Sequence, residues 1–389
     1  MKLLFLACLS PKTGNCTTAE RIRNHIESAG HTCVLRDIGD FQSAGDVAAL
    51  VAREPSFEGA FGIHLYKGGR LLLGTKAPFG IVFGGTDLNE DVKDEKKREV
   101  MEQVLQKARF AVAFSHKLKE EAEVFWLSQS SKIYVQPQGI DTRAAETFSW
   151  RDFLRSSEAS VTPRPTCAQK WGPAQCLSHT IPGSQSTHLT LLRSAWGPEG
   201  ARCEGPSLPG GGLHVFLLVC GLRRVKDPLY LVEAFSEWHA EDPSVVLIII
   251  GPKIDGVFTG EVQQNVERRR GVFLAAERSQ EELHAALKMS SALVNSSVSE
   301  GMSAAILEAM HLGVPVVARD VPGNAAIIRH QDTGLLFSSP QEFVAVSKRL
   351  LGDRPLLERL VRNGRRYVEE CHSLAEERMA YQSLVELLQ

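Results

Sequence analysis

Short apolar runs alternate with longer amphipathic stretches along the first part of the chain. The apolar runs predict strands at residues 2–9, 33–35, 60–64, 79–84, 110–114 and 132–136, and the amphipathic stretches predict helices at 19–29, 95–107 and 118–128. Apolar runs without internal alternation are typical of strands that are covered on both faces of a parallel sheet. Strands that alternate with helices therefore predict a doubly wound, Rossmann-like α/β domain over residues 1–150.

The same rhythm returns in the second part of the chain. It predicts strands at 215–220, 245–250, 271–274, 292–294 and 314–318, and helices at 229–239, 263–270, 279–289 and 304–311. A chain of 389 residues has room for two domains of ordinary size. We therefore expect a second Rossmann-like domain over residues 213–370, followed by a C-terminal helix in 371–389.

Residues 155–212, between the two predicted domains, differ in composition. They are rich in Pro, Gly and Ser, and they follow neither the helical nor the strand period. Such a stretch buries too little apolar surface to offset the entropy lost on ordering. We expect a disordered insert at the hinge.

Charge and composition exclude several classes of function. The formal net charge is −2 and the chain has no long basic run, so nucleic acid is not an expected partner. No apolar run approaches the roughly 20 residues that span a membrane. None of the eight cysteines forms a C-x2-C pair, so no zinc site is expected.

The first nine residues have two interpretations, because one charge followed by apolar residues suits a signal peptide as well as a buried strand. The helix predicted at 19–29 favours the strand, since cleavage would destroy the strand–loop–helix unit. Two glycosylation sequons, at Asn15 and Asn295, also lie where a cleft is expected. We expect a cytoplasmic protein, with secretion as the alternative.

The segment from Ser299 to Ala318 carries the strongest chemical signal. It predicts a short helix between two strands, with Gly301 at the entrance and Glu300 just before it. A second carboxylate, Glu308, follows about two helical turns later. Free N–H groups at a helix N-terminus bind anions. Together, N–H groups for a diphosphate and carboxylates for hydroxyls suit a sugar nucleotide.

These residues resemble a known family. The E-x7-E spacing, with Glu-Ala-Met and Gly-Val-Pro-Val-Val-Ala behind it, is similar to the donor site of retaining glycosyltransferases of family 4. The resemblance covers roughly residues 1–150 and 214–389, and it implies the GT-B architecture of two Rossmann-like domains that face a cleft. It also implies that Glu308 binds the ribose, that Glu300 lies at the donor sugar, and that the backbone of Gly301, Met302 and Ser303 meets sugar and diphosphate.

A cationic loop is the second signal. The apolar run at 215–220 leads into Gly221, then Arg223, Arg224 and Lys226. It resembles the family's Gly–Arg…Lys loop, whose cations neutralise the donor diphosphate; fixed cations stabilise a leaving diphosphate. The spacing is shorter here than in the family, which leaves open whether Arg223 or Arg224 takes the role. Gly251, after the strand at 245–250, corresponds to a family glycine near the nucleotide base.

Three loops of the first domain resemble the family's acceptor side. The expected loop at 10–18 contains Gly14 and Asn15, and the resemblance implies that it faces donor phosphates and acceptor. His64 ends a predicted strand, where the family often has a His near the donor sugar; a buried structural His is an equally good interpretation. Gly85 belongs to a Gly-Gly-Thr-Asp segment that resembles the family's Gly-Thr-Asp after a strand, which implies a structural role with some acceptor contact.

We therefore predict transfer of a sugar from a nucleotide sugar to an unknown acceptor, with retention at the anomeric carbon. The resemblance implies no metal and no cofactor beyond the donor, because Arg, Lys and helix N–H groups neutralise the diphosphate. It also implies a front-face reaction without a protein nucleophile. The alternatives are an epimerase or phosphorylase of the same fold, or a catalytically impaired binding or regulatory protein.

Overall fold

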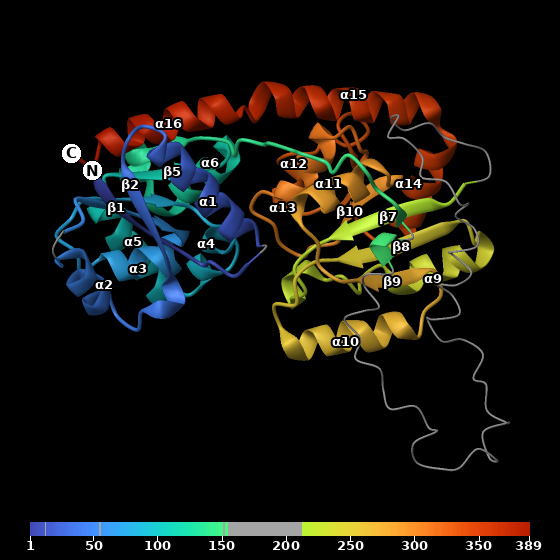
Figure 1. Ribbon diagram of the computed structural model, residues 1–389, viewed down its shortest axis with the longest axis horizontal. Coiled ribbons are helices and arrows are strands. Elements are labelled where there is room, and N and C mark those ends of the chain that lie inside the picture. Colours follow the sequence, from blue (N-terminus) through green and yellow to red (C-terminus); the bar gives the residue numbers. More distant parts are fainter. Residues whose placement is uncertain (12, 54–55, 151, 155–211) are drawn as a thin grey trace, which may run out of the picture.

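The computed structural model describes residues 1–11, 13–53, 56–150, 152–154 and 212–389 (Figure 1). The predicted insert at 155–212 lies outside the described residues, apart from Gly212. Two parallel sheets lie side by side, each flanked by helices. This arrangement confirms the predicted pair of doubly wound α/β units.

The first sheet has six parallel strands in the order β2-β1-β3-β4-β5-β6. They are β1 (Lys2–Ala7), β2 (Thr32–Asp37), β3 (Gly59–Ile63), β4 (Phe79–Val82), β5 (Phe110–Ala113) and β6 (Ile133–Val135). The connecting helices are α1 (Gly14–Glu27), α2 (Ala44–Val51), α3 (Gly69–Leu72), α4 (Gly85–Asn89), α5 (Glu95–Lys107) and α6 (His116–Trp126). A π-helix, η2 (His64–Gly68), joins β3 to α3.

The second sheet also has six parallel strands, in the order β12-β11-β10-β7-β8-β9. They are β7 (His214–Val219), β8 (Val245–Ile250), β9 (Val272–Ala275), β10 (Ala292–Asn295), β11 (Val316–Arg319) and β12 (Leu335–Phe337). Its helices are α9 (Val232–Glu241), α10 (Gly256–Glu267), α11 (Gln280–Lys288), α12 (Ala304–His311), α13 (Pro322–Ala325), α14 (Pro340–Gly352) and α15 (Arg354–Cys371), and a 3₁₀ turn, η6 (Arg224–Lys226), follows β7.

Both sheets are buried on both faces, which explains their unbroken apolar strands. In β1, Leu3 and Phe5 belong to the core on one face, whereas Leu4 and Leu6 belong to the core on the other. Successive side chains of a strand point to opposite faces, so each apolar run supplies two cores at once. In the second sheet β7 does the same: Leu217 and Leu218 belong to different cores.

Several element boundaries differ from the prediction. The helix predicted at 19–29 begins at Gly14, because Thr13 caps it by accepting a hydrogen bond from the Cys16 N–H. Gly14 and Asn15 therefore lie in a first helical turn and not in a loop. Likewise, the helix predicted at 263–270 begins at Gly256, after the cap of Asp255. The strand predicted at 314–318 begins only at Val316.

The C-terminal helices connect the two domains. Figure 1 shows α15 over the second domain and α16 (Leu374–Glu386) over the first. Tyr381, Leu384 and Val385 of α16 lie in the same core cluster as Ile22 and Ile26 of α1. The last helix therefore completes the first domain, although it follows the second in the sequence. Among the residues that the structure describes, no helix has the length and apolarity needed to cross a membrane.

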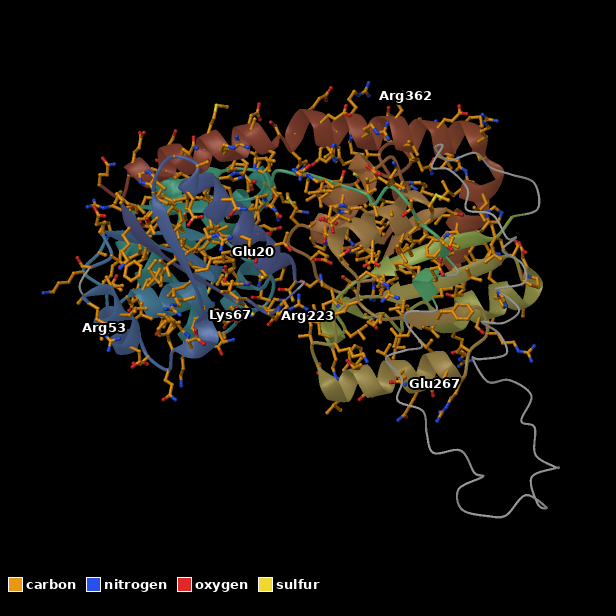
Figure 2. All side chains as sticks on the ribbon, in the orientation of Figure 1. Glu20, Arg53, Lys67, Arg223, Glu267 and Arg362 are labelled. Carbon is orange, nitrogen blue, oxygen red and sulfur yellow. The ribbon has the colours of Figure 1, made fainter. Side chains whose placement is uncertain are left out.

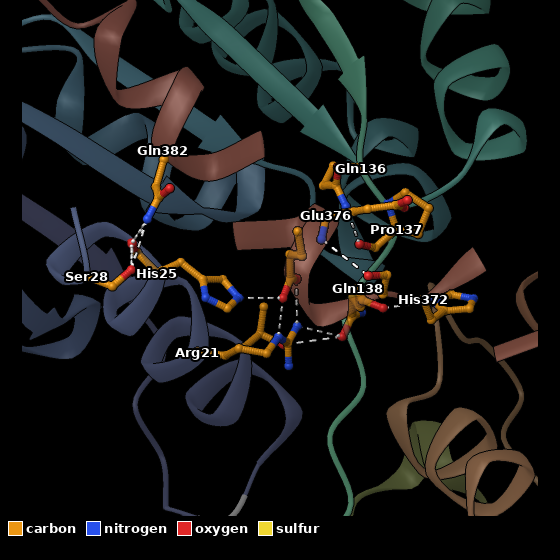
Figure 3. A network of polar contacts seen from close by, with 12 residues as sticks. Arg21, His25, Ser28, Gln136, Pro137, Gln138, His372, Glu376 and Gln382 are labelled. Carbon is orange, nitrogen blue, oxygen red and sulfur yellow. Dashed lines mark hydrogen bonds and ion pairs between the residues drawn. The ribbon is translucent and has the colours of Figure 1, made fainter. Parts of the chain in front are cut away.

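The chain crosses between the domains at two places, and the two crossing segments are bonded to each other. The Ile140 N–H donates to the His372 carbonyl at 3.0 Å, and His372 Nδ1 lies 2.8 Å from the Gln138 carbonyl oxygen (Figure 3). Beside them, the buried Glu377 of α16 accepts from Arg21 Nε at 2.7 Å and lies 2.9 Å from His25 Nε2, both on α1. This cluster fixes the last helix to the first domain at the hinge.

Candidate active site

The two domains touch where β4 and β10 end. The backbones of Gly85, at the start of α4, and Gly301, before α12, lie against each other: a Cβ on Gly301 would fall 2.7 Å from Gly85 Cα. The Asn89 amide of α4 donates to the Glu300 carbonyl at 3.2 Å. The carboxyl ends of parallel strands are where ligands bind in such folds. The structure therefore brings predicted acceptor-side and donor-side residues together.

Glu300 is held by three donors from its own domain. Its Oε1 accepts from Lys226 Nζ at 2.6 Å, from Ser297 Oγ at 2.7 Å and from Asn295 Nδ2 at 3.2 Å. Lys226 lies on η6 after β7, whereas Asn295 ends β10. Two neighbouring strands thus supply the cation and the amide that orient this carboxylate.

These donors keep Glu300 ionised. Burial alone would raise the pKa of its carboxyl, but the Lys226 ammonium and the hydrogen bonds from Lys226, Ser297 and Asn295 outweigh it, so the pKa lies below its usual value. An anionic Glu300 accepts hydrogen bonds and is no proton donor. This charge state suits a residue that binds sugar hydroxyls.

The two arginines of the cationic loop have different surroundings. Arg224 Nη2 lies 2.7 Å from Glu261 Oε1 of α10, and its guanidinium stacks over Phe258. Arg223 is exposed and makes no side-chain hydrogen bond or ion pair within the part of the chain that the structure describes. Figure 2 shows it at the edge of the second domain next to the first. Within the described residues, the guanidinium of Arg224 is therefore engaged, whereas that of Arg223 is not.

Met302 and Ser303 lead into α12. Met302 packs against the core of its own domain and also against the core of the first domain. Ser303 is the N-cap of α12, yet its side chain caps no N–H and instead accepts from Asn295 Nδ2 at 3.3 Å. The first N–H groups of α12 therefore have no side-chain cap, which is the condition for anion binding at a helix N-terminus.

Glu308 lies on α12, on the side that faces α11. Its Oε1 accepts from the Gln280 amide at 3.0 Å, and its Oε2 lies 3.6 Å from Nε2 of the buried His284. Its side chain keeps 12% of its surface exposed. The residue therefore has lone pairs available for a ligand while one oxygen is already oriented.

Gly251 follows β8 directly beside the end of β7. A Cβ at this position would collide with the carbonyl of Cys220, and the Cys220 N–H donates to Ile250 O at 2.9 Å. Close packing of the two strand ends thus requires glycine here. This backbone role accounts for Gly251 whether or not a nucleotide base lies beside it.

His64 lies on the first-domain side of the contact. It is buried, has the left-handed φ of 69°, and starts η2 rather than ending β3. The Asn15 amide lies 3.1 Å from its Nε2, and Thr86 Oγ1 lies 3.2 Å from its Nδ1. With Nε2 accepting from Asn15, Nδ1 carries the proton and donates to Thr86. Both ring nitrogens are engaged, so the ring is fixed in position.

Asp87 holds the loop that carries His64. It is fully buried and accepts the N–H groups of Leu65, Tyr66 and Gly84 at 2.7, 3.3 and 2.8 Å. Three backbone donors on one carboxylate stabilise the left-handed turn, which is otherwise costly. Gly14, in contrast, has open space where a Cβ would stand, with no atom within 4 Å apart from its own helix and chain neighbours.

Sequence reasoning missed Asn89, Gln280 and His284. Asn89 acts on Glu300, 211 positions away, and no local pattern marks it. Gln280 and His284 share one face of a helix that the sequence predicts, but their partner Glu308 lies on another helix. Within the described residues, no group of three or more His, Cys, Asp or Glu side chains could hold a metal ion.

Two Rossmann-like domains in contact form the GT-B arrangement, with the Lys226–Glu300 pair and the uncapped N-terminus of α12 close to the contact. The family model of group 1 glycosyl transferases matches residues 207–367. A glycosyltransferase 1 domain-containing protein 1 from Xenopus tropicalis is 49% identical over 389 residues, which is 100% of this chain and 99% of that protein. The chain belongs to the group 1 glycosyltransferases, and it is a glycosyltransferase.

More distant proteins are similar to part of the chain or share its fold. A UDP-Gal:alpha-D-GlcNAc-diphosphoundecaprenol alpha-1,3-galactosyltransferase from Escherichia coli is 28% identical over 151 residues, which is 36% of this chain and 38% of that protein. Among solved structures, Anabaena HepE in complex with UDP and glucose has a TM-score of 0.67 at 16% identity, covering 99% of both chains. Sucrose-phosphate synthase from Thermosynechococcus elongatus has a TM-score of 0.67 at 15% identity, covering 100% of this chain and 99% of that one. These structures confirm the GT-B fold.

Proposed function

We propose that this glycosyltransferase takes its sugar from a uridine diphosphate sugar and transfers it with retention, without a metal ion. The partly buried Lys226–Glu300 pair beside the N-terminus of α12 carries the proposal. The diphosphate would lie at the uncapped N–H groups of α12 with Arg223 and Lys226 beside it. Glu308 would accept hydrogen bonds from the ribose, and Glu300 from the sugar.

The charges of the site support a reaction in which fixed cations take the place of a metal. The bond between the anomeric carbon and the phosphate oxygen breaks, and negative charge grows on the leaving diphosphate. Arg223 and Lys226 lie on the loop that would face this charge, and preorganised cations stabilise such a transition state. The negative charge of Glu300 also balances Lys226 before the donor binds.

The acceptor would approach from the first domain, past His64 and Gly85. In a front-face reaction, the acceptor oxygen bonds to the anomeric carbon on the side that the phosphate leaves. The acceptor proton then passes to the leaving phosphate oxygen. No protein nucleophile is needed, which agrees with an ionised Glu300 engaged by three donors. The fixed His64 would line the sugar pocket, with Asn15 and Thr86 holding its ring.

The choice of a uracil base rests on similar proteins. HepE is in complex with UDP-glucose, and the Escherichia coli relative is a UDP-Gal transferase. HepE shares the fold over 99% of both chains, and the Escherichia coli relative is similar to this chain over 151 residues.

The cytoplasm is the compartment that we propose. In both sequons the amide nitrogen that would carry a glycan is already bonded: Asn15 Nδ2 to His64, and Asn295 Nδ2 to Glu300 and Ser303. Asn295 is also buried. A glycan at either position would disrupt the site, which supports a compartment without N-glycosylation.

The test is binding and turnover of nucleotide sugars. We expect UDP, UDP-glucose or UDP-galactose to raise the melting temperature, with GDP and GDP-mannose weaker, because a ligand that binds only the folded state stabilises it by RT ln(1 + [L]/Kd). Donor turnover should continue in excess EDTA, and the product should keep the anomeric configuration of the donor. Stabilisation by none of these nucleotides would overturn the proposal. Epimerised donor without UDP release, or transfer only from a sugar phosphate, would replace it with an epimerase or a phosphorylase.

A further inference from the structure

A chain of hydrogen bonds connects Glu308 with the segment that joins the two domains. The Gln280 amide nitrogen lies 3.0 Å from Glu308 Oε1 and 2.9 Å from His284 Nε2. On the other side of the ring, His284 Nδ1 lies 3.0 Å from the carbonyl oxygen of Arg143. Arg143 belongs to the crossing segment, so the chain runs from the proposed ribose carboxylate to the hinge.

The imidazole of His284 lies between the Gln280 amide and the Arg143 backbone. An amide nitrogen carries two hydrogens, and Gln280 can give one to Glu308 and the other to His284 Nε2. On the other side of the ring, Nδ1 meets the Arg143 backbone at both the carbonyl oxygen, 3.0 Å away, and the N–H, 3.1 Å away. His284 thus contacts Gln280 through Nε2 and the backbone of Arg143 through Nδ1. The ring is 1% exposed, so no solvent replaces a lost partner.

The crossing segment is attached to the same two helices by further bonds. The Ala145 N–H donates to the Glu281 carbonyl of α11 at 3.0 Å. Thr142 Oγ1 lies 3.0 Å from Nδ1 of His311, the last residue of α12. Glu308 is on α12 and Gln280 is on α11. A shift of either helix on nucleotide binding would therefore move the crossing segment, because residues 142, 143 and 145 are hydrogen-bonded to these helices.

We propose that Gln280 and His284 are positioning residues that orient Glu308 for the nucleotide and couple its occupancy to the interdomain segment. The inference rests on the proposed function, in which Glu308 accepts from the ribose. A ribose hydroxyl that donates to Glu308 competes with the Gln280 amide for the carboxylate. Any movement of that amide changes the partner of His284 Nε2, and His284 carries the change to Arg143.

Two substitutions of His284 test the contacts of its two ring nitrogens separately. In His284→Asn, the short amide stands near the Nδ1 position and keeps a donor for Arg143, but Gln280 loses its acceptor. In His284→Gln, the longer amide stands near Nε2 and keeps a partner for Gln280, but the bond to Arg143 is lost. Gln280→Ala removes an exposed side chain from the first turn of α11, so it tests the same chain without disturbing packing.

The measurement is calorimetric titration of the full-length protein with UDP and with GDP. We expect His284→Asn and Gln280→Ala each to weaken binding of the preferred nucleotide about fivefold, the effect of losing one hydrogen bond. The double variant should bind no more weakly than either single variant, because both changes break one chain. His284→Gln should bind nearly as wild type, yet its amides at residues 141–145 should show no change in hydrogen exchange when nucleotide is added. Wild type should show that change.

The controls distinguish this inference from the proposed function. Gln263→Ala breaks a similar Gln–Glu pair on α10, and His239→Asn alters a ring bonded to the Val245 carbonyl at the other end of the sheet; both should bind as wild type. If Glu308→Gln leaves the affinity for both nucleotides unchanged, the ribose role in the proposed function is wrong. If Glu308→Gln weakens binding while His284→Asn and Gln280→Ala bind as wild type, only the coupling is wrong. Full additivity in the double variant would also overturn the coupling.

Discussion

Gly85 and Gly301 lie backbone against backbone, one from each domain. A Cβ on Gly85 would fall 3.2 Å from the Gly301 nitrogen, and a Cβ on Gly301 would fall 2.7 Å from Gly85 Cα. The second distance is shorter than any ordinary contact, and what it meets is backbone, which cannot rotate away. The pair therefore sets how closely the loop that contains Gly301 approaches the first domain.

Replacing Gly301 by alanine should hold the two domains apart at this contact. We expect a fall in turnover with little loss of fold stability, because the domains have separate cores and only their approach is blocked. Closure completes many active sites, so donor hydrolysis and transfer should both slow. Turnover and small-angle scattering with and without UDP would measure this, with a larger radius of gyration expected for the variant in UDP.

The matched control is Gly260→Ala, on α10, where an added Cβ meets nothing within 4 Å. This change should leave turnover unaltered and raise stability slightly, because alanine is favoured over glycine inside a helix. Equal turnover for Gly301→Ala and Gly260→Ala would show that the observed approach of the two glycines is not required for catalysis.

Arg223 and Arg224 offer a second matched pair. Arg223→Ala should reduce turnover strongly, because the side chain has no partner within the described structure and is available to the diphosphate. Arg224→Ala should have a much smaller effect, since it loses the exposed pair with Glu261 and the stacking on Phe258. Single-turnover rates with a donor that binds would decide. A larger loss for Arg224→Ala would reverse the assignment of the two residues.

Lys226→Ala should make stability depend on pH in a specific way. In wild type the pKa of Glu300 is lowered, so its contribution is present above the usual value of 4.5 and is lost as pH falls through the lower folded value. Without Lys226, burial is less opposed and the pKa rises. The variant should therefore lose about 3 kcal/mol at pH 7, the cost of breaking a buried pair, and less at pH 4.

Urea denaturation at several pH values measures this difference, with Lys348→Ala as the control. Lys348 lies 2.7 Å from Glu241 on an exposed surface, and such pairs contribute about 0–1 kcal/mol. The loss of unfolding free energy in Lys226→Ala could be as small as this, or could fail to shrink at low pH. Either result would mean that the lysine does not stabilise the ionised carboxylate of Glu300.

Much of this fold could be predicted because each element carries its own local signal. The helices at 95–107 and 304–311 and the strand at 245–250 have the observed bounds. Boundaries shifted where a cap decided them, as at Thr13. The role of α16 was not predictable, because its apolar face shows that it packs but not that its partner is α1, more than 350 residues earlier.

The candidate site also has one part that could be predicted from the sequence and one part that could not. Glu300, Lys226 and Glu308 follow strands or lie on short helices whose order implies a common edge of the sheet. The choice between Arg223 and Arg224 depends on the position of Glu261, which the sequence does not reveal. The contact between Gly85 and Gly301 depends on the arrangement of two domains, and the periodicity of one domain carries no information about the other.

The cluster of Glu377, Arg21 and His25, which joins the last helix to the first domain, gives a final prediction. Glu377 is fully buried, and although burial raises the pKa of its carboxyl, hydrogen bonds from His25 and the charge of Arg21 lower it overall. Its stabilising effect is thus present above pH 4.5 and is lost as pH falls through the lower folded value.

Glu377→Gln leaves Arg21 without its carboxylate and should cost about 3–5 kcal/mol at pH 7, less at pH 4. Glu376→Gln, on the exposed neighbouring position that Figure 3 labels, should change the unfolding free energy by less than about 0.5 kcal/mol. Equal unfolding free energies for the two variants in urea would show that α16 is held by its apolar face alone.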